Sequence, residues 1–229
     1  WLDQKLVEWK PIQKSSIKFN GHMVLTSEDN IDLSSPEVDS KFFEMLSSLN
    51  TDTISFLITP TMYKKYESRY QDIFSEVKKS KKQLYISYVV DKQYSSFSEY
   101  TDEELNFIKI FVEKNHPDYF TVVDEETTME KRAGINATDA QWKELAIEAI
   151  NLIKTISPET KTVVNGHQLE IDFLKSLTDI KNLDYIGFSL WGIEPINVAT
   201  PAGKKIKETI QYLQNNGKEI IFEQTWTIN

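Results

Sequence analysis

Short apolar runs alternate with longer amphipathic stretches along most of the chain. The runs are rich in Val, Ile, Tyr and Phe at consecutive positions, which is typical of parallel strands buried on both faces. They follow one another at intervals of about 30 residues, the length of a strand–helix unit. The seven predicted strands are His22–Thr26, Thr53–Thr59, Gln83–Val90, Asp118–Asp124, Lys161–Asn165, Asp184–Leu190 and Lys218–Glu223.

The stretches between the runs carry helix signals. The sequence Thr138–Gln141 is a capping box, and apolar residues recur behind it at helical spacing. The sequence Thr101–Glu104 follows the same pattern. A Ser or Thr followed by Pro marks a first helical turn, and Gly often follows a last one. These signals predict helix starts at Ser35, Thr101, Thr138 and Thr200 and a helix end at Gly217.

Seven strands that alternate with helices fit an open doubly wound sheet or a (β/α)8 barrel. An open nucleotide-binding sheet carries a glycine-rich phosphate turn after its first strand. Here residues 27–30, Ser-Glu-Asp-Asn, follow the first strand, with no glycine and with two acids that repel phosphate. We therefore expect an α/β fold of the (β/α)8 TIM-barrel type, with the last β/α unit missing or irregular. Residues 1–229 then form a single domain, with residues 1–17 as an N-terminal extension.

Composition narrows the classes of function. The 26 basic and 35 acidic residues give a net charge of −9, which opposes binding to DNA or RNA. No apolar run reaches the ~18 residues of a membrane span. The absence of cysteine removes thiol nucleophiles, zinc–thiolate sites and iron–sulfur clusters, and no cofactor is expected. The sequon at residues 136–138 favours an extracellular or cell-surface location, while a cytoplasmic one stays open.

Two apolar strands lead directly into carboxylates. Residues 120–123 run into Asp124 and Glu125, and residues 220–222 run into Glu223. A carboxylate at the end of a buried strand loses hydration, which costs free energy unless the group is paired or used. Strands four and seven face each other across the mouth of a barrel, where catalytic groups gather. Two acids placed there suit retaining glycoside hydrolysis, in which one protonates the leaving oxygen and the other attacks the sugar.

Three short motifs carry a family resemblance. Strand four ends in Asp124-Glu125, strand six reads Asp-Tyr-Ile-Gly-Phe-Ser over residues 184–189, and strand seven ends in Glu-Gln-Thr-Trp over residues 223–226. The chain thus resembles the clan of retaining (β/α)8 glycoside hydrolases with catalytic glutamates on strands four and seven. The resemblance implies that Glu125 is the general acid/base and Glu223 the nucleophile. Asp124 takes the place of an asparagine that donates to the sugar, and an ionised aspartate can only accept.

Other side chains at the strand ends are candidates for sugar binding. The faces of Trp191 and Trp226 suit the C–H face of a pyranose, although packing under loops explains them equally well. His167 after the fifth strand is a candidate for contacts to sugar hydroxyls, with a structural hydrogen bond as the alternative. With Asp124, these residues form the predicted substrate-binding set.

Several alternatives stay open at the sequence level. Glu126 replaces Glu125 as the acid if the register shifts by one residue. Residues 124–126 also suit the acidic start of a helix, and Glu223 suits an ion pair with Lys or Arg. Asp124, Glu126 and His167 have no recognised metal-ligand spacing, so no metal is expected.

The predicted function is retaining hydrolysis of a β-linked oligo- or polysaccharide, with carbohydrate as the substrate. The alternative is a catalytically inactive glycosidase-like barrel that binds glycan or a protein partner, which the Asp at position 124 favours. An unrelated barrel enzyme such as a metal-dependent lyase is disfavoured, because the chain has 3 His and no Lys at a strand end.

Overall fold

The computed structural model describes residues 20–24, 44, 48, 51–191 and 200–226. Within these ranges, seven parallel strands form one sheet in chain order. The strands are β1 (Asn20–Val24), β2 (Thr53–Ile58), β3 (Gln83–Tyr88), β4 (Tyr119–Asp124), β5 (Lys161–His167), β6 (Tyr185–Trp191) and β7 (Glu219–Trp226). The helices are α3 (Pro60–Lys65), α4 (Glu67–Lys79), α5 (Phe97–Asn115), α6 (Glu126–Ala133), α7 (Asp139–Ile156), α8 (Ile171–Ser176) and α9 (Pro201–Asn215), with a 3-10 turn at Leu177–Asp179. The predicted N-terminal extension and the helix start at Ser35 lie outside the described residues.

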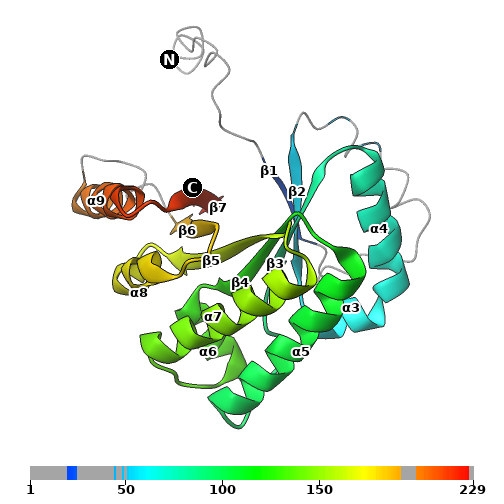
Figure 1. Ribbon diagram of the computed structural model, residues 1–229, viewed down its shortest axis with the longest axis horizontal. Coiled ribbons are helices and arrows are strands. Elements are labelled where there is room, and N and C mark those ends of the chain that lie inside the picture. The colour runs from blue at the N-terminus through cyan, green and yellow to red at the C-terminus, as the bar shows by residue number, and fades with distance from the viewer. Residues whose placement is uncertain (1–19, 25–43, 45–47, 49–50, 192–199, 227–229) are drawn as a thin grey trace, which may run out of the picture.

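The sheet is curled, and the helices lie on its outer side. Figure 1 shows the strands inside an arc of helices that runs from α4 through α5 and α7 to α8 and α9. A doubly wound sheet reverses its strand order at a switch point and has helices on both faces. The described strands keep their chain order throughout. The barrel class is therefore confirmed, in the form of an incomplete (β/α) barrel.

Local sequence signals set several helix ends. The Thr138 hydroxyl accepts from the Gln141 N–H and the Gln141 side chain accepts from the Thr138 N–H, which confirms the capping box. Thr200 caps α9, with Pro201 in the first turn. Gly217 follows the end of α9 with a φ of 75°, a left-handed conformation that glycine adopts without steric cost.

The predicted helix start at Thr101 is wrong. Helix α5 begins one turn earlier, where the Ser96 hydroxyl accepts a hydrogen bond from the Glu99 N–H. Because that cap starts the helix, Thr101 and Glu104 lie inside it rather than at its end. Glu104 is completely buried, at 0% exposure, and has no capping role.

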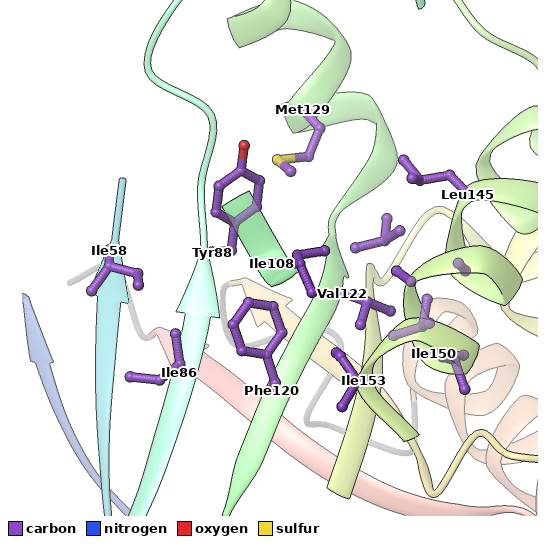
Figure 2. Packing of buried hydrophobic residues seen from close by; sticks show 14 of the residues in the cluster. Ile58, Ile86, Tyr88, Ile108, Phe120, Val122, Met129, Leu145, Ile150 and Ile153 are labelled. Carbon is purple, nitrogen blue, oxygen red and sulfur yellow. The ribbon is translucent and has the colours of Figure 1, made fainter. Parts of the chain in front are cut away.

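The main hydrophobic core lies between the sheet and the helices. Figure 2 shows Ile86, Phe120 and Val122 from the strands close to Ile108 and Ile153 from the helices. Burial of apolar surface contributes roughly 25 cal/mol per Å², so this layer is the main source of stability. In the described part of the chain, no helix combines the length and the apolar character needed to cross a bilayer.

The concave face changes from apolar to polar along the strands. Near the amino ends, Tyr85, Tyr119 and Val163 form a second, smaller apolar cluster. The carboxyl ends of parallel strands meet at one mouth of the barrel. The buried polar side chains toward that end are Ser87, Thr121, Asp124, Asn165, Ser189 and Glu223.

Candidate active site

Register shifts in β4 and β7 lie beside the two candidate carboxylates. In β4, the pairing with β5 skips Val122. Val122 and Val123 both pack in the outer core, so Asp124 faces inward, where simple alternation would have turned it outward. In β7, the pairing with β6 skips Glu223 itself. Bulges of this kind re-aim side chains at barrel rims and next to active sites.

Side chains from two neighbouring strands hold the Asp124 carboxylate. Asn165 Nδ2 on β5 donates to Asp124 Oδ1 at 2.7 Å, and Ser87 Oγ on β3 donates to Asp124 Oδ2 at 3.0 Å. Asn165 Nδ2 also donates to Ser189 Oγ on β6 at 2.8 Å. Each carboxylate oxygen therefore has its own donor, an arrangement that favours the ionised form.

Glu223 reaches from β7 across the interior to β4. Thr121 Oγ1 lies 3.2 Å from each of its two carboxyl oxygens, and the Tyr85 hydroxyl lies 2.9 Å from Thr121 Oγ1. Thr121 has one hydroxyl proton to donate. Within the described ranges, neither Glu223 nor Asp124 forms an ion pair. The alternative in which Glu223 is paired with a cation therefore has no support in those ranges.

Burial and mutual repulsion change the acidity of the two carboxyls. Burial raises the pKa of Glu223 above its usual range, and the negative charge of Asp124 raises it further. Burial also raises the pKa of Asp124, while the hydrogen bond from Asn165 opposes the rise. Two acids this close in a dry site titrate as a pair, because the first charge disfavours the second.

Glu125 occupies the turn from β4 into α6. Its φ of 56° is left-handed, which is uncommon for a residue with a side chain. Its N–H donates to the Asn165 carbonyl at 3.0 Å, and its Oε2 accepts from Thr128 Oγ1 at 2.8 Å. Strained backbone of this kind clusters at functional sites.

A pocket of about 830 Å³ lies beside Glu125. The turn after β4, the connection between α6 and α7, and the connection between β5 and α8 form its walls. This volume lies within the range of small-molecule sites. Side chains that line it include Glu125, Thr128, Lys131, Asn136, His167 and Leu169.

Glu126 is buried in the first turn of α6 and does not line this pocket. Burial raises the pKa of Glu126 to about 8, and the negative charges of Glu170 and Asp139 add to the rise. Its strongest charged neighbours are therefore not Asp124 or Glu223. In the described ranges, no group of three or more His, Asp or Glu side chains is arranged to hold a metal ion.

The remaining predicted residues lie at the same end of the sheet. His167 ends β5 and lines the pocket, and its N–H donates to Glu170 Oε2 at 2.7 Å. Its Nδ1 accepts from the Leu169 N–H at 3.3 Å. Trp191 and Trp226 pair with each other in the ladder between β6 and β7. The structure thus brings Asp124 and Glu223 together in the interior and places Glu125 and His167 on one pocket.

Sequence reasoning missed the side chains that hold the two acids. Ser87, Thr121 and Asn165 are each polar, buried and inward-facing within otherwise apolar strands. A polar residue inside a fully buried strand needs a partner, because an unpaired polar group there is costly. That signal was present in the sequence at all three positions.

Gly187 on β6 leaves the space that the Asn165 amide occupies. A Cβ at position 187 would lie 2.7 Å from Asn165 Oδ1 and 3.2 Å from Asn165 Cα. We expect Gly187→Ala to lower the free energy of unfolding by about 1–3 kcal/mol, because the amide must move away from Asp124. Urea denaturation measures this, and the same change should cost less in an Asn165→Ala background. Equal costs in both backgrounds would contradict the proposed contact.

Comparison with known proteins supports the fold. No protein-family model and no curated protein matches the sequence. An exo-β-1,4-mannosidase from Opitutaceae bacterium strain TAV5 matches with a TM-score of 0.61 and 12% identity, over 85% of this chain and 44% of that one. A thermostable mutant of a xylanase from Cellvibrio japonicus matches with a TM-score of 0.60 and 9% identity. The match covers 91% of this chain and 69% of the xylanase. A fungal β-1,4-galactanase matches with a TM-score of 0.56 and 12% identity. The match covers 80% of this chain and 65% of the galactanase.

These neighbours are glycoside hydrolases. Because their sequences are so different from this one, the comparison shows a shared fold only. The chain spans less than half of the mannosidase and about two thirds of the galactanase. Its incomplete parallel barrel, with helices on the outer side, resembles the barrels of the retaining glycoside hydrolase clan. The fold and the resemblance expected from the sequence are therefore confirmed.

Proposed function

We propose that this chain is a retaining glycoside hydrolase, or the described part of one, acting on a β-linked oligo- or polysaccharide. The observation that carries the proposal is the approach of Glu223 on β7 to β4, with Thr121 Oγ1 3.2 Å from both its carboxyl oxygens. Glu125 directly follows β4, the strand that carries Thr121, and borders the pocket. An acid that follows strand four and an acid on strand seven are the pair that the two-carboxylate mechanism uses.

In this proposal Glu125 is the general acid/base and Glu223 is the nucleophile. Glu125 gives its proton to the glycosidic oxygen while a Glu223 carboxylate oxygen bonds to the anomeric carbon. Glu125 then takes a proton from water, and the resulting hydroxide displaces Glu223 and restores both groups. Glu126 is the weaker candidate for the acid, since it does not line the pocket.

Carbohydrate is the proposed ligand of the surrounding residues. His167 lines the pocket and supplies a side chain for sugar hydroxyls. Trp191 and Trp226, at the carboxyl ends of neighbouring strands, are proposed as stacking surfaces. Asp124 would accept hydrogen bonds from the sugar or act on Glu223. We propose an extracellular or cell-surface role, in keeping with the sequon at Asn136.

Hydrolysis of a substrate panel tests the proposal. Aryl β-glycosides of xylose, mannose, galactose and glucose, and the matching β-1,4-linked polymers, cover the substrates that the structural neighbours' names give. We expect release of aryl alcohol or reducing ends from at least one substrate. Absence of hydrolysis across the panel, with binding retained, would favour the second candidate instead.

The second candidate is an inactive glycosidase-like barrel that binds glycan or a protein partner. Asp124 favours it, because a negative charge beside Glu223 disfavours the ionised nucleophile that retention needs. Calorimetric titration with the same polymers would separate a pure glycan binder from an enzyme.

A further inference from the structure

The two interior acids differ in the kind of donor that faces them. Asp124 accepts from Asn165 Nδ2 at one oxygen and from Ser87 Oγ at the other. Glu223 faces the hydroxyls of Thr121, at 3.2 Å from both of its oxygens, and of Tyr85 and Ser87, each with one proton, and the Ser87 proton goes to Asp124. Hydrogen bonds to a carboxylate stabilise its charged form. An amide N–H can only donate, whereas the Thr121 and Tyr85 hydroxyls also bond to each other, so Asp124 is the better-stabilised anion of the two.

The groups that act on the two acids from the described elements are hydroxyls, an amide and further carboxylates. Tyr85 faces Glu223 from β3, while Asp124 and Glu125 come from β4. Glu170 acts on Asp124 from the connection after β5. In the described ranges, no Lys or Arg forms an ion pair with Asp124 or Glu223. Both acids are more than nine-tenths buried, so water screens their repulsion poorly.

We propose that Asp124 keeps a proton on Glu223 in the free protein and thereby sets the pH at which Glu223 can act as a nucleophile. Asp124 is in this view a positioning residue that acts through Glu223. The part of the proposal that concerns reactivity rests on the proposed function, while the proton sharing does not. An asparagine at position 124 would carry no charge and would release Glu223 to ionise at lower pH.

A carboxyl titration tests the proton sharing without any substrate. In protein labelled with ¹³C at the Glu side-chain carboxyls, the Glu223 signal is the one that disappears in Glu223→Gln. We expect this signal to titrate above neutral pH in the unaltered chain. Asp124→Asn should move its midpoint down by about one pH unit or more, because a like charge is removed. Asp172→Asn, which alters an exposed carboxylate on α8, should leave it unchanged.

A second variant moves the midpoint in the other direction. Thr121→Val keeps the shape of the side chain and removes one of the hydroxyls that face Glu223, so the Glu223 midpoint should rise. This variant keeps the proposal testable if Asp124→Asn does not fold. A Glu223 midpoint near the ordinary glutamate value of about 4.3 in the unaltered chain would overturn the proposal. An unchanged midpoint in either folded variant would overturn it as well.

The pH dependence of kcat/KM separates this inference from the proposed function. If the chain hydrolyses glycosides, the acidic limb of kcat/KM reports ionisation in the free enzyme. That limb should move to lower pH in Asp124→Asn by the same amount as the carboxyl signal, and a fixed limb would overturn the link to reactivity. A carboxyl signal that moves in a chain without hydrolytic activity would support the proton sharing and count against the proposed function.

Discussion

Replacing Glu223 with glutamine is expected to reduce kcat by roughly 10⁴-fold or more, since loss of an attacking nucleophile has effects of this size or larger. The amide has nearly the same shape as the carboxyl and can still accept from Thr121 Oγ1, so the fold should persist. Removing one of two buried, mutually repelling acids also removes an unfavourable interaction. Initial rates on the best substrate of the panel measure the loss of kcat. Thermal unfolding measures whether the fold persists and how removal of the repulsion changes stability.

A matched substitution on the same strand controls for changes to β7. Glu219 begins β7 at its amino end, where its side chain is exposed and far along the strand from the mouth. Glu219→Gln should leave kcat and thermal stability close to those of the unaltered protein. If Glu223→Gln retains kcat within tenfold, Glu223 is not the nucleophile and the role belongs to another acid.

Replacing Glu104 with glutamine is expected to remove a large pH-dependent loss of stability. Glu104 is 0% exposed and faces the Tyr100 hydroxyl, and among the described residues its carboxyl oxygens have no charged partner. The Glu104 charge also acts on the buried hydroxyl of Tyr88. Burial therefore raises the pKa of Glu104 to about 8 in the folded chain.

The sign of the effect follows from where the proton is held. Between the unfolded pKa of about 4.3 and the folded pKa, the folded chain keeps a proton that the unfolded chain releases. Stability then falls as pH rises through this window, and the full loss, on the order of 5 kcal/mol, is present above pH 8. Glutamine cannot ionise, so the variant should lack this contribution.

Urea denaturation between pH 5 and 9 measures this contribution as the difference between variant and parent. Glu113→Gln, which alters an exposed glutamate on the same helix, is the matched control and should not change the slope. Other buried acids titrate equally in both chains and cancel in the difference. A Glu104→Gln variant with the same pH slope as the parent would show that Glu104 is ionised in the fold.

The fold was largely predictable because hydrophobic patterning is a local property. Every predicted strand overlaps an observed one, and the Thr138 and Thr200 caps lie where their short sequences indicate. The error at Thr101 has a local cause as well. Its Thr-x-x-Glu sequence is indistinguishable from a capping box unless the helix start at Ser96 is already known.

The site was only partly predictable because its geometry depends on the pairing of distant strands. The position of Glu125 directly after β4 followed from the sequence, whereas β7 continues three residues past Glu223, where the sequence predicted its end. The shift that turns Asp124 inward depends on how β4 pairs with β5, which a pattern along β4 alone does not specify. The same holds for Thr121 and Glu223, which are far apart in the sequence and meet across the interior.

The stereochemistry of hydrolysis tests the central claim most directly. Proton NMR of the anomeric region, recorded during the first minutes of cleavage of a β-linked substrate, identifies the anomer released before mutarotation. A nucleophilic Glu223 paired with the acid Glu125 gives two inversions at the anomeric carbon, so the first product should be the β anomer. Initial release of the α anomer would mean direct attack by water and would contradict the account.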